Sequence, residues 1–218
     1  MPAPRSIRIE KLAKLACASC AAVWGLFWIP LRALDDAGIH GPWATALFAV
    51  VPLVLLLPLL VTRWNVFAAS GWPLQRIGLL IGISFVCYSN AFLYTDVIRV
   101  LVLFYMTIVW GTLLARIWLK ETISFSRGIA IILGFSGMFV IFSAEPGIPQ
   151  PSNVGDWLGL ISGLAWAFAA VLMKREKKTD PRDLSVSYFI WATIIALSML
   201  WMPFLGQPEV PDSSDVVV

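Results

Sequence analysis

Cys17 and Cys20 have the C-x-x-C spacing that zinc sites and thiol redox centres use. A structural zinc site needs a second pair of ligands, and the third cysteine, Cys87, stands alone. His40 is the only histidine, so a serine-based triad or a histidine-rich metal site finds too few partners. We therefore interpret the cysteines as small packing residues and predict no metal, no cofactor and no enzymatic activity.

The remaining candidates for binding chemistry are aromatic and neutral polar side chains. Two pairs are spaced by four residues, which places each pair on one face of a helix. A buried amide is costly unless it meets a partner or a wet cavity, so Asn90 is the strongest candidate. For each of the others, plain core packing or lipid contact is the alternative. The predicted substrate-binding residues are Trp24, Trp28, Asn90, Tyr94, Tyr105 and Trp166.

The composition indicates where such a site would lie. Of the 218 residues, 59% are hydrophobic and 13% are charged, against about 45–50% and about 25% in ordinary soluble proteins. A membrane-spanning helix needs about 20 mostly apolar residues, so the chain has room for roughly seven or eight spans and no separate catalytic domain. The net charge is only +3, whereas the mean hydropathy of +0.83 is high. We therefore expect the lipid bilayer, and not nucleic acid, as a partner.

Apolar runs bounded by charged residues, glycine or proline predict seven helices and an all-α integral membrane fold. Residues 1–11 are a basic N-terminus, 144–156 a linker and 206–218 a polar tail. Five helices fall in 12–143 and two in 157–205. The predicted spans are 12–34, 43–61, 77–94, 97–119, 125–143, 157–173 and 186–205.

The basic residues predict the orientation of these helices. If the N-terminus is cytoplasmic, the segments outside the cell hold only Arg32 and Arg99 of the 16 lysines and arginines. The other fourteen then lie inside, as the positive-inside rule requires. We therefore expect a cytoplasmic N-terminus and an external linker and tail.

Asp96 and Arg99 are three residues apart at the predicted outer start of the fourth helix. They predict an interfacial salt bridge, or alternatively a gate for a charged solute. Glycines 155, 159 and 163 recur every four residues along the sixth helix, which indicates close helix packing or a sliding surface between moving bundles. No acidic or basic residue lies near the centre of a predicted span, so we expect no carboxylate relay for protons.

A weak internal repeat relates two of the helices. The seven residues from Ala22 can be laid over the seven from Leu164, so that Trp24 meets Trp166. The two copies begin five helices apart, and an odd repeat length inverts the second copy in the membrane. Many secondary transporters have this inverted-repeat plan.

The sequence resembles the EamA-type family of the drug/metabolite transporter superfamily. The resemblance rests on Trp24-Gly25, the segment 90–95, the sequence LKETIS at 119–124, and Gly134 with Gly137. It implies ten helices in two inverted units of five, which move small organic solutes across a bacterial inner membrane. This chain then holds the first unit and the first two helices of the second.

Three departures from the family pattern shape further expectations. Lys120 stands where the family often has glycine, and Ile108 stands where its fourth helix often has proline. We therefore expect a familiar break in that helix to be missing. The second unit stops after two helices, which predicts a fragment of a ten-helix carrier or a chain that does not complete the family mechanism alone.

The predicted function is membrane transport, by an exporter or facilitator, of small organic metabolites such as amino acids or related compounds, by alternating access. The predicted partners are the small-molecule substrate and the lipid bilayer. One alternative is a seven-helix receptor or sensor, although residues 186–205 contain no lysine for a retinal Schiff base. Another is an inactive fragment of a carrier.

Overall fold

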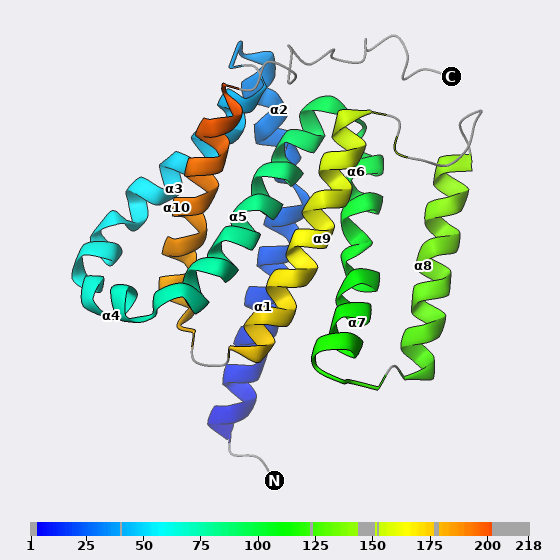
Figure 1. Ribbon diagram of the computed structural model, residues 1–218, viewed down its shortest axis with the longest axis horizontal. Coiled ribbons are helices and arrows are strands. Elements are labelled where there is room, and N and C mark those ends of the chain that lie inside the picture. Colours follow the sequence, from blue (N-terminus) through cyan, green and yellow to red (C-terminus); the bar gives the residue numbers. More distant parts are fainter. Residues whose placement is uncertain are drawn as a thin grey trace.

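The computed structural model describes residues 4–39, 41–122, 124–143, 151, 153–176 and 179–201. Within these residues every regular element is a helix, which confirms the predicted all-α fold (Figure 1). The helices are α1 (Pro4–Gly25), α2 (Trp28–Asp36), α3 (Pro42–Thr62), α4 (Trp64–Ala69), α5 (Gly71–Tyr94), α6 (Val97–Tyr105), α7 (Thr107–Trp118), α8 (Phe125–Ser143), α9 (Val154–Arg175) and α10 (Pro181–Met199).

Five helical segments of the described chain are long and apolar enough to cross a membrane, as an integral membrane protein requires. In α8 the stretch Gly128–Gly137 is apolar but shorter, and α10 opens on the polar residues Arg182 and Asp183. Spanning by α8 and α10 stays a prediction. The five segments are Glu10–Asp36, Pro42–Thr62, Gly71–Tyr94, Val97–Trp118 and Val154–Arg175.

Two of these spans are interrupted. The first is broken at Leu26 and Phe27, between α1 and α2, where we expected one continuous helix. The fourth is broken at Met106, so the expectation drawn from Ile108 was wrong. The break needs no proline: the Val109 N–H donates to the Met106 carbonyl at 2.9 Å, a tight 3₁₀-like turn between two α-helices.

The two ends of the bundle are distinct in Figure 1. We call one end the N-terminal face: it holds the start of α1, all of α4, and the turns that join α7 to α8 and α9 to α10. The other end, the opposite face, holds α2, the start of α9 and the turn from α5 to α6. The helix α4 at the N-terminal face was not predicted; it ends just before Gly71, whose φ of +56° suits glycine.

The helix α5 lies in the middle of the bundle and packs closely against α10. A Cβ atom at Gly78 would lie 2.1 Å from Ser187 Oγ, and one at Gly82 would lie 2.8 Å from the Ala192 nitrogen. The Ser187 hydroxyl also donates to Gln75 Oε1 at 3.1 Å. Backbones can approach this closely only where side chains are absent, so these glycines fix the α5–α10 contact.

The glycines of α9 have the same role against α5 and α6. A Cβ at Gly155 would lie 2.8 Å from Thr95 Cβ, and one at Gly163 would lie 2.7 Å from the Phe104 carbonyl oxygen. The glycines of α9 therefore form a close packing surface in this structure.

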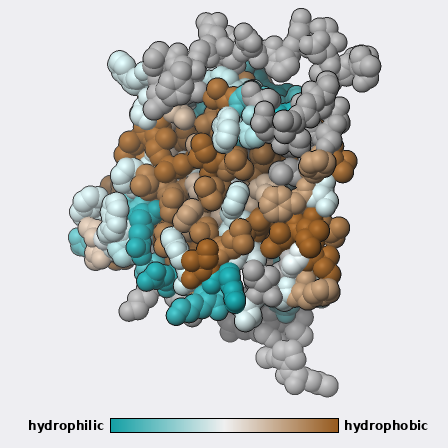
Figure 2. Space-filling model, turned by 45° about the vertical axis from the view of Figure 1, so that its right-hand side comes forward, coloured by the Kyte–Doolittle hydropathy of each residue, from teal (hydrophilic) through white to brown (hydrophobic). Residues whose placement is uncertain are grey.

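The outer surface is apolar, as lipid contact requires. Figure 2 shows a broad hydrophobic area across the middle of the molecule, with hydrophilic residues gathered toward one end. Large exposed apolar side chains include Leu55 and Val61 on α3 and Leu133 on α8. A surface of this kind suits a bilayer better than water.

Candidate functional site

A cavity of about 340 Å³ lies between α1, α5, α9 and α10, which is within the range of small-molecule sites. It is lined in mid-bundle by residues of α1, α5 and α9, and it extends toward the N-terminal face, where α9 ends and α10 begins. The lining residues are Trp24, Ile81, Ser84, Phe85, Trp166, Met173, Pro181, Leu184, Ser185 and Tyr188.

None of the described residues that line the cavity carries a charged side chain. Its two serines donate their hydroxyl hydrogens to backbone carbonyls: Ser84 to Ser162 at 2.9 Å and Ser185 to Pro181 at 2.9 Å. Their oxygen lone pairs remain able to accept hydrogen bonds. The cavity thus offers aromatic faces, aliphatic surface and a few neutral polar atoms.

Trp24 lies at the end of α1, next to the break that precedes α2. Its ring stacks on Tyr88 with centroids 5.5 Å apart and on Phe27 at 5.5 Å. Stacking of this kind holds a large ring in one orientation. The indole is therefore fixed at one wall of the cavity.

Trp166 of α9 lines the same cavity and packs against the apolar core. The internal repeat paired it with Trp24, and the structure brings both rings to one site. Sequence reasoning missed the contribution of α10, although Leu184, Ser185 and Tyr188 have the spacing of one helix face.

The other four predicted residues lie outside this lining. Trp28 does not share a continuous helix with Trp24; it packs under Arg32, whose guanidinium carbon is 5.8 Å from the Trp28 ring centroid. Tyr94 packs against the core, and Tyr105 is 56% exposed at the end of α6. Their role in binding stays a prediction.

Asn90 is fully buried, as its candidacy required. Its Nδ2 donates to the Val86 carbonyl at 2.9 Å and contacts Met199 Sδ at 3.7 Å. Its Oδ1 has no hydrogen-bond partner among the described residues. A buried amide oxygen without a partner favours the approach of a polar ligand or water.

A buried polar network joins α5, α6 and α9 at the opposite face. Arg99 of α6 donates to both carboxylate oxygens of Asp156, with distances of 3.1 Å and 2.5 Å. Thr95 Oγ1 donates to Asp156 Oδ1 at 2.9 Å, and Asn153 Nδ2 donates to Thr95 Oγ1 at 3.0 Å. The exposed salt bridge predicted between Asp96 and Arg99 is thus replaced by a buried pair with Asp156.

Among the described residues, three ion-pair groups link elements at the N-terminal face. Arg63, which follows α3, pairs with Asp180 and Asp183 at the start of α10, at 2.9 and 2.8 Å. The hydrogen bond to Asp183 raises the pKa of Arg63, which keeps it charged. The Arg182 backbone N–H and side chain, which donate to Asp180, hold the pKa of that carboxyl below its usual value.

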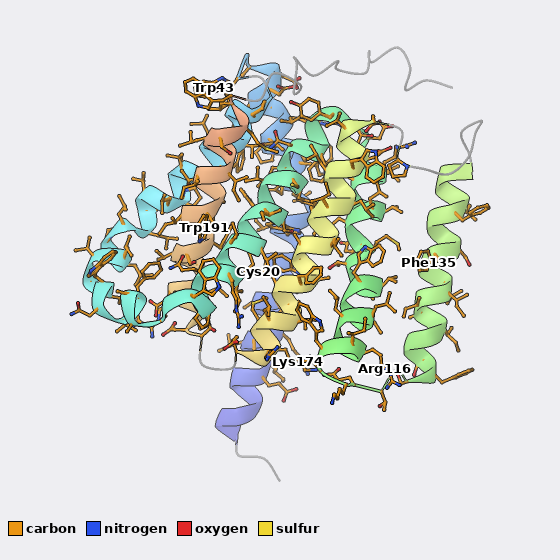
Figure 3. The ribbon with its side chains drawn as sticks, in the orientation of Figure 1. Cys20, Trp43, Arg116, Phe135, Lys174 and Trp191 are labelled. Carbon is orange, nitrogen blue, oxygen red and sulfur yellow. The ribbon has the colours of Figure 1, made fainter. Side chains whose placement is uncertain are left out.

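The other two groups join α9 to neighbouring elements. Arg76 of α5 pairs with Glu176, and Lys174 pairs with Glu121 in the turn between α7 and α8. Figure 3 shows Lys174 and Arg116 at this face, whereas Trp43 lies at the opposite face. The described residues contain no group of three or more His, Cys, Asp and Glu that could hold a metal ion.

Comparison with known families shows the family to which this chain belongs. A model of the EamA-like transporter family matches residues 11–143, more than half of the chain. The chain belongs to the EamA-like transporter family. The matched residues include α2 to α8 and most of α1, so the EamA region supplies the cavity walls from α1 and α5.

A curated relative carries a transporter name. The uncharacterized transporter YvbV of Bacillus subtilis (strain 168) is 29% identical over 176 residues, which are 74% of this chain and 53% of the relative. The chain spans about half the length of this relative.

Proposed function

We propose that this EamA protein carries a small organic solute across a membrane and that the 340 Å³ cavity is its solute site. The observation that carries the proposal is the shared lining. Trp24 of the EamA-matched region and Trp166 of α9 meet in one cavity, as the binding site of an inverted-repeat carrier is shared between repeats.

The lining favours solutes with apolar or aromatic groups and little net charge, such as neutral amino acids and related metabolites. A solute with a net charge would lose hydration in this cavity without gaining an oppositely charged partner, whereas the two opposite charges of a zwitterion partly compensate each other. Alternating access would open the cavity to one face at a time.

Asn90 is proposed to contact the solute when the solute moves from the cavity toward the opposite face. It lies six residues, about 9 Å, from Ser84 along α5 toward the opposite face, and its Oδ1 has no hydrogen-bond partner among the described residues. Trp28 and Tyr94 are proposed to line the route at this end, and Tyr105, at the far end of α6, is proposed to line it nearer the middle of the bundle.

The transport proposal is tested by reconstituting the full-length gene product in liposomes with a panel of labelled neutral aliphatic and aromatic amino acids. One contact in a binding pocket is worth about 1–3 kcal/mol, so Trp24→Ala and Trp166→Ala are each expected to lower the uptake rate about tenfold or more. Trp64→Ala is the matched control, because Trp64 is exposed on α4. Equal uptake by all three variants would contradict the site.

We also propose that the N-terminal face is cytoplasmic, in a bacterial inner membrane, because most lysines and arginines then lie inside. A cysteine at Thr179 should react with an impermeant thiol reagent only after lysis, and one at Asp36 should react in intact cells. Replacing the native cysteines by alanine removes the background. The reverse pattern would invert the topology.

A further inference from the structure

Between the cavity and the opposite face, three layers follow one another along a single face of α5. Ser84 lines the cavity, Tyr88 and Phe92 form an aromatic layer, and Thr95 belongs to the buried polar network. Their spacings of four, four and three residues place them on one side of the helix. At 1.5 Å per residue, Thr95 lies about 16 Å beyond Ser84.

The same order holds on α9. Trp166 lines the cavity, and Asp156 lies ten residues earlier, about 15 Å toward the opposite face. The two helices are tied beside the cavity by the Ser84–Ser162 hydrogen bond and at the far end by Thr95 and Asp156. The α5–α9 seam is the proposed route of the solute, and it ends at the polar network.

The aromatic layer closes this route below the network. Tyr88 packs edge-on against Phe92, with ring centroids 4.7 Å apart, and against Phe104 of α6 at 4.7 Å. All three residues are buried. A solute in the cavity would have to part these rings before it reached the network.

The polar network joins four helices, α2, α5, α6 and α9, at one point. Arg99 and Asp156 have side-chain exposures of 9% and 0%, and Thr95 and Asn153 complete the hydrogen bonds. Arg32 of α2 donates to the Thr95 carbonyl at 3.4 Å. A well-packed apolar contact would join these helices at least as strongly as a buried ion pair. A charge pair, however, can separate and be hydrated.

We propose that the Arg99–Asp156 pair is the gate at the opposite face, closed in this structure and broken when the cavity opens to that side. The inference rests on the proposed transport function. When Asp156 leaves Arg99 and Thr95, the start of α9 parts from the α5–α6 turn. Gly155 has no side chain that could interlock with this turn, although it packs closely against the Thr95 side chain and the Tyr94 backbone.

The test measures access to the cavity and needs no solute. Ser84→Cys, with Cys17, Cys20 and Cys87 replaced by alanine, is labelled in oriented vesicles with a charged thiol reagent added at one face. We expect slow labelling from the opposite face. Adding Asp156→Asn should raise that rate about tenfold, which corresponds to a shift of about 1.4 kcal/mol toward the open state.

Two further variants separate a gate from a structural tie. Asp96→Asn is the matched control, because Asp96 is exposed on the same turn as Arg99, and it should leave the rate unchanged. Thr95→Cys with Gly155→Cys should form a disulfide once the backbones of the two segments move apart by about 1 Å, because a Cβ at Gly155 lies 2.8 Å from both Thr95 Cβ and the Tyr94 carbonyl carbon. The disulfide should abolish labelling of Ser84→Cys from the opposite face.

A folded Asp156→Asn variant with the parental labelling rate would overturn the proposal. Should Asp156→Asn fail to fold, Arg99→Lys keeps the charge with a weaker tie and should raise the rate about threefold; an unchanged rate would again overturn it. Labelling from the N-terminal face should change in none of the substitution variants. Absence of transport in liposomes would contradict the proposed function and leave the labelling result to decide the gate.

Discussion

The two ends of this bundle are held together in different ways. At the opposite face the wholly buried carboxylate of Asp156 accepts hydrogen bonds from Arg99 and Thr95. At the N-terminal face the ion pairs are spread over several elements, and apart from the buried Asp183 carboxylate their side chains are partly exposed; the Lys174 side chain is 59% accessible. Water and salt screen exposed charges, whereas a buried charge depends wholly on its partners.

We therefore expect one substitution at Asp156 to weaken the opposite face strongly, whereas each substitution at the N-terminal face should remove only part of the stability of that end. Removing one member of a buried pair leaves an uncompensated charge in the interior. Removing one member of an exposed pair returns the other to water, at little cost. Three substitutions test this contrast, in order of decreasing effect.

Asp156→Ala should have the largest effect. It removes a charged partner of Arg99 and the acceptor of Thr95, so we expect the free energy of unfolding to fall by about 3–5 kcal/mol. Chemical denaturation in detergent micelles measures this loss. Asp96→Ala should change stability little, and an equal loss in both variants would remove the special position of Asp156.

Arg63→Ala should have an intermediate effect. Asp183 is buried and receives two hydrogen bonds from Arg63, so its carboxylate would lose its main partner. We expect a loss of about 1–3 kcal/mol in the same unfolding measurement. Arg182→Ala serves as the comparison, because the Arg182 side chain is mostly exposed and lies 3.3 Å from Asp180. A larger loss for Arg182→Ala would contradict the assignment.

Glu121→Gln should have the smallest effect. Its partner Lys174 is exposed, and such pairs contribute about 0–1 kcal/mol, less at high salt. The unfolding curve should be nearly that of the parent at 0.5 M salt. A loss as large as that of Arg63→Ala would show that the N-terminal face is held by strongly coupled charges and would end the contrast.

Hydropathy predicted the helical fold well because each apolar run is long enough to be read without tertiary information. The helix α8 begins at Phe125 and ends at Ser143, the bounds expected from the sequence. The helix breaks were not predicted, because the turn at Met106 needs neither glycine nor proline. Short α4 was missed, since its six residues form no apolar run of spanning length.

The candidate site was predicted only in part. The internal repeat pointed to Trp24 and Trp166, and the structure brings both to the cavity. Asp156 was assigned to an exterior linker, because Asp156 is polar and precedes the apolar run. Asn153 caps α9 by accepting the Asp156 N–H at 2.8 Å, which extends the helix by one turn and carries the carboxylate into the interior. Its partner Arg99 is distant in sequence, so spacing alone could not reveal the pair.

The cavity volume has a thermodynamic consequence. About 340 Å³ equals the share of bulk liquid that on the order of ten water molecules occupy. A solute that fills this space removes apolar lining, such as Ile81 and Leu184, from contact with solvent. Burial of apolar surface lowers the heat capacity, so binding should become more exothermic as the temperature rises. Calorimetry at several temperatures would thus show a negative heat-capacity change for a solute that fills the cavity, independently of the direction of transport.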